Sequence, residues 1–140
     1  MLGKAIKIAA EAFENVKDKG GQPYILHCLR VMDNLHTKDE ELKTIAVLHD
    51  VLEDTKITAD DLRFIGFKNR VVSALELLTH VENLSYDDYI KAISFNEDAR
   101  LVKLADLKDN SDITRLKGLR KKDLERMEKY HRSYIYLSEI

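Results

Sequence analysis

The stretch ELKTIAVLHDVLED, residues 41–54, predicts a helix whose last turns are rich in acids. Leu42, Ile45 and His49 recur at helical spacing, so they share one face of that helix. We expect this face to pack into the core, which would bury the His49 imidazole. Asp50 follows directly. A helix that is apolar on one face needs other helices to cover it.

Two further acids follow this histidine. If the helix continues through its last turn, Glu53 lies beside His49 and Asp54 lies beside Asp50. Buried carboxylates without a counter-charge are costly, and a divalent cation would neutralise them. The alternative is a core histidine followed by an exposed acidic helix end. Carboxylates at a helix C-terminus oppose the helix dipole, which weighs against that alternative.

The rest of the chain has the same helical periodicity and no convincing alternating strand. The 140 residues include only five glycines and one proline, which favours long helices joined by short loops. We therefore expect an all-α fold of about eight helices in a single domain, residues 1–140. Gly20-Gly21 should end the first helix, and Pro23 should lie in the first turn of the second. The helices are predicted at about 4–17, 23–36, 39–51, 58–66, 69–80, 85–95, 97–109 and 121–139.

Composition also excludes several classes of protein. Cys28 is the only cysteine, so neither a disulfide framework nor a cysteine-based zinc site can form within the chain. No apolar run approaches the ~18 residues of a membrane span. The N-terminal stretch contains Lys4 and Lys7 and lacks the uninterrupted apolar region of a signal peptide. We expect a cytoplasmic protein without a membrane partner.

The net charge of −2 gives no overall attraction to a nucleic-acid polymer. The charge is unevenly distributed, because residues 33–61 are acidic and residues 115–132 are basic. The basic segment could attract phosphate groups, or it could be a solvated helix face with i,i+4 ion pairs.

Two other positions break apolar helix faces. His27 lies on the apolar face of the second predicted helix, and Asp106 interrupts the run LVKLADL at residues 101–107. Taken alone, the first could be a core histidine and the second a solvent-facing acid. Together with His49 and Asp50 they form a mixed nitrogen and oxygen set, which suits Mn²⁺, Fe²⁺, Co²⁺ or Zn²⁺ better than Ca²⁺. A water on such a metal becomes a nucleophile near neutral pH.

The order of these residues resembles the H…HD…D pattern of the HD superfamily of metal-dependent phosphohydrolases. The segments GQPYILH (21–27), LHDVLEDT (48–55) and KLAD (103–106), the last with Asn110 four residues later, resemble motifs of the RelA/SpoT hydrolase domain. The resemblance covers about residues 3–137. It implies a stand-alone small alarmone hydrolase with a compact HD-domain helical bundle and Mn²⁺ dependence. Such enzymes remove the 3′-pyrophosphate of (p)ppGpp to give GDP or GTP and pyrophosphate.

The resemblance also implies roles for individual residues. Two histidines and two aspartates would hold the metal: His27, His49, Asp50 and Asp106. Glu53 and Asp54 would be the catalytic acidic pair, one activating the water and the other assisting the leaving 3′-oxygen. We favour Glu53 as the base.

Five further residues are candidates for substrate binding. Lys103 would steady Asp106 or meet a phosphate, and Asn110 would hydrogen-bond the nucleotide. Tyr24 would line the pocket or pack in the core. Lys17 and Lys19 would contact phosphates, or they are ordinary surface lysines.

The sequence departs from the family pattern where the family recognises the base. The family usually has an Arg-Lys pair near the guanine, where this chain has Asp18 and Lys19. Asp109 stands in the segment LKDN where the family commonly has RLHN, and Cys28 replaces a proline. The metal and acidic residues therefore match the family better than the base-reading residues do.

Two alternatives to alarmone hydrolysis follow. One is a phosphohydrolase of another nucleotide or nucleotide cofactor, which the absent arginine favours. The other is a catalytically silent nucleotide-binding regulatory module, against which the presence of Glu53 and Asp54 argues. In each case the partner is a small nucleotide. The sequence leaves the oligomeric state open, with a homo-oligomer as one outcome.

Overall fold

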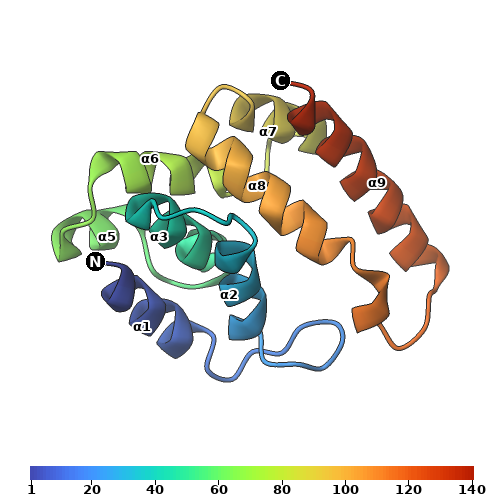
Figure 1. Ribbon diagram of the computed structural model, residues 1–140, viewed down its shortest axis with the longest axis horizontal. Coiled ribbons are helices and arrows are strands. Elements are labelled where there is room, and N and C mark those ends of the chain that lie inside the picture. The colour runs from blue at the N-terminus through green and yellow to red at the C-terminus, as the bar shows by residue number, and fades with distance from the viewer.

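The computed structural model describes residues 1–140 and is all-helical, which confirms the predicted fold class (Figure 1). Its only β-type pairing is an isolated bridge between Lys17 and Pro23. None of its helices has both the length and the apolar character needed to span a membrane. The elements are α1 (Leu2–Ala12), α2 (Ile25–Asp33), α3 (Glu40–Leu48), α4 (Val51–Asp54), α5 (Ala59–Ile65), α6 (Asn69–Leu78), α7 (Tyr86–Ile93), α8 (Glu97–Asn110), a 3-10 turn η1 (Ile113–Arg115) and α9 (Lys121–Ser138).

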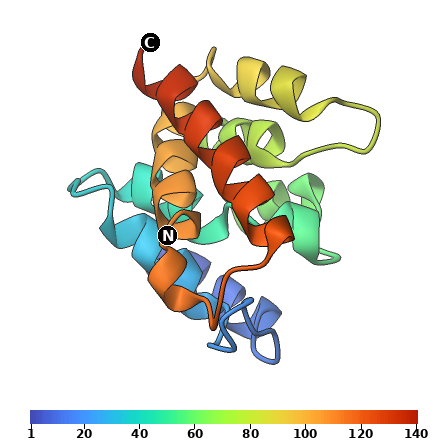
Figure 2. The same cartoon turned by 90° about the vertical axis from the view of Figure 1, so that its right-hand side faces the viewer.

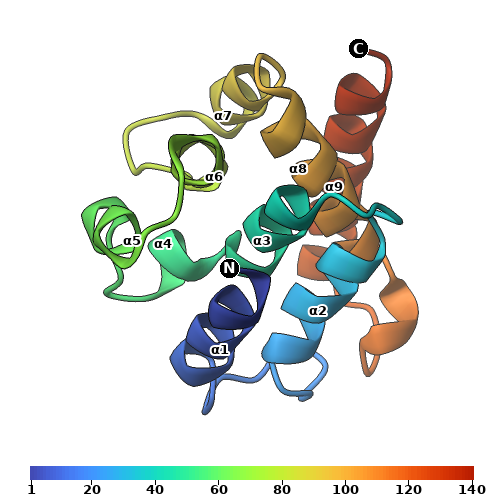
Figure 3. The same ribbon diagram turned by 60° about the vertical axis from the view of Figure 1, so that its left-hand side comes forward.

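Helix α3 forms the centre of the bundle, with α1, α2, α6 and α8 packed around it (Figure 3). Its residues from Thr44 to Leu48 are all buried. A helix buried on every side belongs in the interior, and this one therefore holds its C-terminal end in a fixed position. Helix α9 lies across α8 and α7 on the outside of the bundle (Figure 2).

The starts of α3 and α8 are tied together by one arginine. Asp39 caps α3 by accepting hydrogen bonds from the backbone N–H groups of its first turn. Arg70 donates to Asp39 and also to Asp98 in the first turn of α8. Helix α8 carries the candidate ligand Asp106, and His49 and Asp50 follow the end of α3, so the relative placement of the two helices bears on the site.

The predicted first helix is too long, since α1 ends at Ala12. The following loop is held by the Asp18 carboxylate, which accepts from the backbone N–H groups of Gly20 and Gln22 at 2.9 Å each. Gly20 and Gly21 therefore belong to this loop and do not end the helix. Pro23 also lies outside a helix, because α2 begins at Ile25.

The predicted helix 39–51 is interrupted, and this raises the number of α-helices from about eight to nine. The backbone N–H of His49 bonds the Ala46 carbonyl at 3.3 Å, and its ring Nδ1 bonds the same oxygen at 2.7 Å. These bonds tighten the last turn, so α3 ends at Leu48. Helix α4 begins after Asp50 in a new direction.

Candidate metal centre

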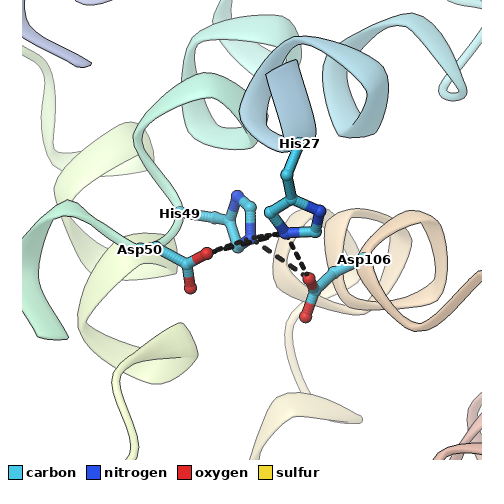
Figure 4. Close-up of side chains that lie close together, drawn as sticks. All are labelled: His27, His49, Asp50 and Asp106. Atoms are coloured by element: carbon cyan, nitrogen blue, oxygen red, sulfur yellow. Dashed lines mark hydrogen bonds and ion pairs between the residues drawn. The ribbon is translucent and has the colours of Figure 1, made fainter. Parts of the chain in front are cut away.

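The four predicted metal ligands converge from three parts of the bundle (Figure 4). His27 comes from α2, His49 and Asp50 from the break after α3, and Asp106 from α8. Their donor atoms all lie within 4.8 Å of one another. The His27 Nε2 atom is 3.3 Å from His49 Nε2 and 3.0 Å from Asp106 Oδ1. The His49 Nε2 atom is 2.9 Å from Asp50 Oδ2.

The hydrogen bonds of the two imidazoles decide which nitrogens face the centre. The Nδ1 atom of His49 donates to the Ala46 carbonyl, and the Nδ1 atom of His27 donates to Asp109 Oδ2 at 2.6 Å. Burial would raise the pKa of Asp109, but its bonds to His27 and Arg30 lower that pKa and keep the carboxylate ionised. In the neutral form, with the proton on Nδ1, each ring directs the lone pair of Nε2 at the shared centre.

Two lone pairs and two carboxylates around one buried point repel each other unless a cation lies between them. The donor set therefore fits a divalent metal ion. Its mixture of imidazole and carboxylate suits Mn²⁺, Fe²⁺, Co²⁺ or Zn²⁺.

The charges of the cluster are strongly coupled. Burial alone would lower the pKa of His49, but Asp50 and Asp106 outweigh it and raise that pKa well above its usual value. Burial would raise the pKa of Asp106, but Lys103 and then His49 hold it well below the usual range. The cluster is thus built to keep its carboxylates ionised in a buried place.

Asp106 is held from both sides along its own helix. The Lys103 ammonium lies 2.9 Å from Asp106 Oδ2, and the Asn110 side-chain amide donates to Oδ1 at 3.0 Å. Lys103 is therefore placed to steady Asp106, one of the two functions considered for it. Asn110, for which a nucleotide contact was expected, has its amide N–H engaged with Asp106.

The predicted acidic pair lies beside this cluster. The carboxylate oxygens of Asp50, Glu53 and Asp54 are within 4.8 Å of one another. Partial burial, followed by the charges of Asp50 and Glu53, raises the pKa of Asp54 to about 6. The Glu53 carboxylate accepts a hydrogen bond from the His80 backbone N–H at 2.6 Å. The exposed turn of α4 therefore presents two acids with different surroundings to the same site.

Two adjoining cavities reach the cluster. The first, here the metal chamber, has a volume of about 210 Å³ and is lined by Asp50, Glu53, Asp54, Lys103, Asp106 and Lys129, among others. The second, here the basic chamber, has a volume of about 300 Å³ and is lined by Lys17, Lys19, Arg115, Leu116, Arg126 and Met127, among others. Tyr24, Asn110 and Tyr130 line both. A ligand could therefore extend from one chamber into the other.

The remaining predicted residues lie at these chambers. The Tyr24 hydroxyl donates to Asp50 Oδ2 at 2.6 Å, so Tyr24 both lines the pocket and positions a candidate ligand. Lys17 and Lys19 are exposed at the edge of the basic chamber. Burial, followed by the charge of Arg126, lowers the pKa of Lys19, as expected where cations gather.

Sequence reasoning missed several residues around the site. Asp109 is buried behind His27, and Arg30 and Arg115 lie against it. The spacing of Asp109, three residues after Asp106, was a signal that both lie on the same side of α8. Arg126 and Tyr130 are one turn apart on α9, inside the segment that the charge pattern had marked as basic.

No family model matches the chain. It is 35% identical over 119 residues to a guanosine-3′,5′-bis(diphosphate) 3′-pyrophosphohydrolase of Aquifex aeolicus. It is 31% identical over 122 residues to the bifunctional (p)ppGpp synthase/hydrolase SpoT of Escherichia coli K12. Each alignment covers 78% of the chain. This chain is homologous to the HD domain of (p)ppGpp 3′-pyrophosphohydrolases. The HD domain described here spans only 17% of the length of either relative.

The fold of this HD domain also has a solved counterpart. A metazoan orthologue of SpoT, described as hydrolysing ppGpp, superposes with a TM-score of 0.79. The match covers 97% of this chain and 84% of the other, at 22% sequence identity. The two proteins therefore share the whole helical arrangement, including the helices that carry the cluster.

Proposed function

We propose that this HD domain is a metal-dependent phosphohydrolase that removes the 3′-pyrophosphate from (p)ppGpp, giving GDP or GTP and pyrophosphate. The observation that carries the proposal is the convergence of two imidazole Nε2 atoms and two carboxylates beside a second acidic pair. Hydrolysis of a phosphate ester by water needs this combination of a cation site and proton-transfer groups. The activities for which the relatives are named support the choice of substrate.

The metal, for which we propose Mn²⁺, would be held by His27, His49, Asp50 and Asp106. When bound, it supplies Lewis-acid activation of water and of the phosphate. The side chains of the protein would bind the substrate and transfer protons. Lys103 and Lys129 line the metal chamber and would face the negative charge of the pyrophosphate.

We assign different functions to the two acids of α4. Glu53 accepts the proton of the attacking water, in an orientation fixed by its bond to the His80 backbone. Asp54, with a pKa raised to about 6, is the acid that can protonate the leaving 3′-oxygen near neutral pH.

The rest of the nucleotide would occupy the basic chamber. Lys17, Lys19 and Arg126 would contact its 5′-phosphates, while Tyr24 and Tyr130 would line the passage between the chambers. A small nucleotide is thus the proposed partner, in the cytoplasm.

One observation favours the second candidate, a phosphohydrolase of another nucleotide. Asp18, which stands where the resemblance implies an arginine near the guanine, is bonded to Arg115 at 3.0 Å and to two backbone N–H groups. Recognition of the base therefore differs from that of the family at this position.

The test is product analysis after incubation of the protein with ppGpp and Mn²⁺. EDTA and Glu53→Ala are the controls. We expect metal-dependent release of GDP and pyrophosphate that is lost in both controls. A folded, metal-loaded protein that leaves ppGpp intact but hydrolyses another nucleotide of a panel would establish the second candidate instead.

A further inference from the structure

Asp109 lies on the far side of His27 from the metal cluster. Its Oδ2 atom accepts a hydrogen bond from His27 Nδ1 at 2.6 Å, across 82 residues of sequence. Both side chains are buried, with exposed fractions of 6% for Asp109 and 3% for His27. The imidazole is therefore held between the cluster at Nε2 and a carboxylate at Nδ1.

Two arginines fix the Asp109 side chain in turn. Arg30 donates from Nε to Oδ1 at 2.8 Å and from Nη2 to Oδ2 at 3.1 Å. Such a two-point contact between a guanidinium and a carboxylate prevents the carboxylate from rotating. Arg115 donates to the Asp109 backbone carbonyl at 3.0 Å, and its Nη2 lies 3.5 Å from Oδ2. The two contacts from Arg30 and the nearby Arg115 guanidinium thus fix the carboxylate that faces the ring.

The position of Arg115 is itself constrained. It bonds Asp18 at 3.0 Å, and a Cβ atom at Gly20 would lie 2.3 Å from the Arg115 carbonyl oxygen. The loop that contains Asp18 is therefore pressed against η1, and only glycine allows this approach. This contact braces the Arg115 guanidinium, which contacts Asp109.

A carboxylate as buried as Asp109 is a poor means of gaining stability. Desolvation of an ion pair commonly offsets its attraction, and apolar residues of similar size often serve equally well. The Arg30 side chain is 36% exposed and could be solvated without this partner. The arrangement is better explained by what the carboxylate does to His27.

We propose that Asp109 is a positioning residue, which holds the His27 ring so that Nε2 faces the metal. The inference rests on the metal site of the proposed function, whatever nucleotide that site hydrolyses. A carboxylate behind a metal-bound histidine fixes the ring's tautomer and orientation and strengthens the nitrogen as a ligand. Loss of such a partner typically weakens metal binding about 10- to 100-fold.

The first test measures metal affinity, without any nucleotide. Asp109→Asn keeps the shape of the side chain and removes its charge. We expect its dissociation constant for Mn²⁺, measured by competition with a chromophoric chelator, to rise about 10- to 100-fold. Glu76→Gln is the control, because it removes an arginine-bonded carboxylate of α6 that lines neither chamber. Its affinity should equal that of the wild type.

The second test measures which nitrogen of the His27 ring carries the proton. In the Zn²⁺-loaded wild type, nitrogen NMR should show His27 protonated at Nδ1 and metal-bound at Nε2. The Nδ1 proton should resonate far downfield because of its short bond to Asp109. This signal should move upfield in Asp109→Asn and stay in place in Glu76→Gln. Arg30→Gln, which leaves the carboxylate but removes its two-point contact, should show a smaller loss of Mn²⁺ affinity.

Wild-type affinity together with an unchanged Nδ1 signal in Asp109→Asn would overturn the inference. A variant that only melts earlier, with wild-type metal affinity, would overturn it as well, since that is the behaviour of a purely structural residue. A wild-type protein that binds neither Mn²⁺ nor Zn²⁺ would refute both the metal site and the inference. A wild-type protein that binds metal but leaves ppGpp intact would refute only the choice of substrate.

Discussion

The metal chamber and the basic chamber share three lining residues but are built from different kinds of structure. The metal cluster is formed by side chains of α2 and α8 and of the break after α3, and all of them but Asp50 are buried. The basic chamber is lined largely by the loop after α1, by η1 and by α9, with exposed lysines at its edge. In the function proposed here, the reaction therefore takes place beside the packed core, and the nucleotide is recognised at the periphery.

This difference has a physical consequence for substitutions. In the cluster, the charged groups are bonded to one another and are largely shielded from water, so each loss leaves another charge uncompensated. In the basic chamber, water can replace a lost contact at small cost. Substitutions in the cluster should therefore abolish metal binding, whereas substitutions in the basic chamber should only weaken nucleotide binding.

The largest effect is expected from Asp106→Ala. It removes a candidate ligand and leaves the buried Lys103 ammonium without its carboxylate. We expect Mn²⁺ affinity to fall at least about 100-fold. Loss of a residue that only hydrogen-bonds to a metal ligand already lowers metal affinity about 10- to 100-fold, and the loss of a ligand should lower it further. Isothermal titration calorimetry measures the affinity, with circular dichroism to confirm the fold. A folded variant that binds Mn²⁺ as tightly as the wild type would contradict the ligand assignment.

A smaller effect is expected from Arg126→Gln in the basic chamber. This change removes one cation that we place against the nucleotide phosphates. We expect KM for the hydrolysed nucleotide to rise about tenfold with kcat unchanged, because the lost contact is equally strong in the ground and transition states. Lys121→Gln, at the exposed start of the same helix, is the control and should leave both constants unchanged. A fall in kcat alone would instead place Arg126 at the reacting groups.

The smallest effect concerns Asp54 in the metal-free protein. Its pKa in the folded state is about 6, above the ~3.9 of an unfolded aspartate, so this carboxyl favours folding only while protonated. The contribution is lost as the pH rises from about 4 through 6. At pH 7.5, Asp54→Asn should therefore melt a few degrees above the wild type, and at pH 5 the difference should shrink.

Thermal unfolding in EDTA at the two pH values measures this difference. Asp60→Asn serves as the control, because Asp60 is an almost fully exposed acid, and we expect its effect to be the same at both pH values. An Asp54→Asn variant less stable than the wild type at pH 7.5 would show that the ionised carboxylate makes a favourable contact in the native protein.

The sequence was sufficient to predict the fold class and the central helix. Leu42, Ile45 and His49 recur at helical spacing within a largely apolar run, and scarce glycine and proline indicated the same all-α class. The break at His49 was not predictable from spacing. It depends on a bond between the imidazole and the Ala46 carbonyl, which competes with the regular helical ladder.

The convergence of His27 and Asp106 on one cluster was predictable, because each is a polar residue that interrupts an apolar helix face. Asp109 was noted only as a departure from the family pattern, because in the segment LKDNSD it resembles any surface acid. Its burial depends on Arg30, 79 residues away in the sequence, and such a partner is visible only in three dimensions. For the same reason Asp18 was interpreted as a missing arginine, whereas the structure shows it holding Arg115.

The spacing of the cluster along the chain bears on how the protein folds. His27 and His49 are 22 residues apart, and His49 and Asp106 are 57 residues apart. An ion bound to all of them would act as a non-covalent cross-link that closes two long loops at one point. The entropy of closing such loops opposes folding, and ligand binding to the native state alone opposes unfolding. A bound ion would therefore stabilise the folded chain as well as complete the site.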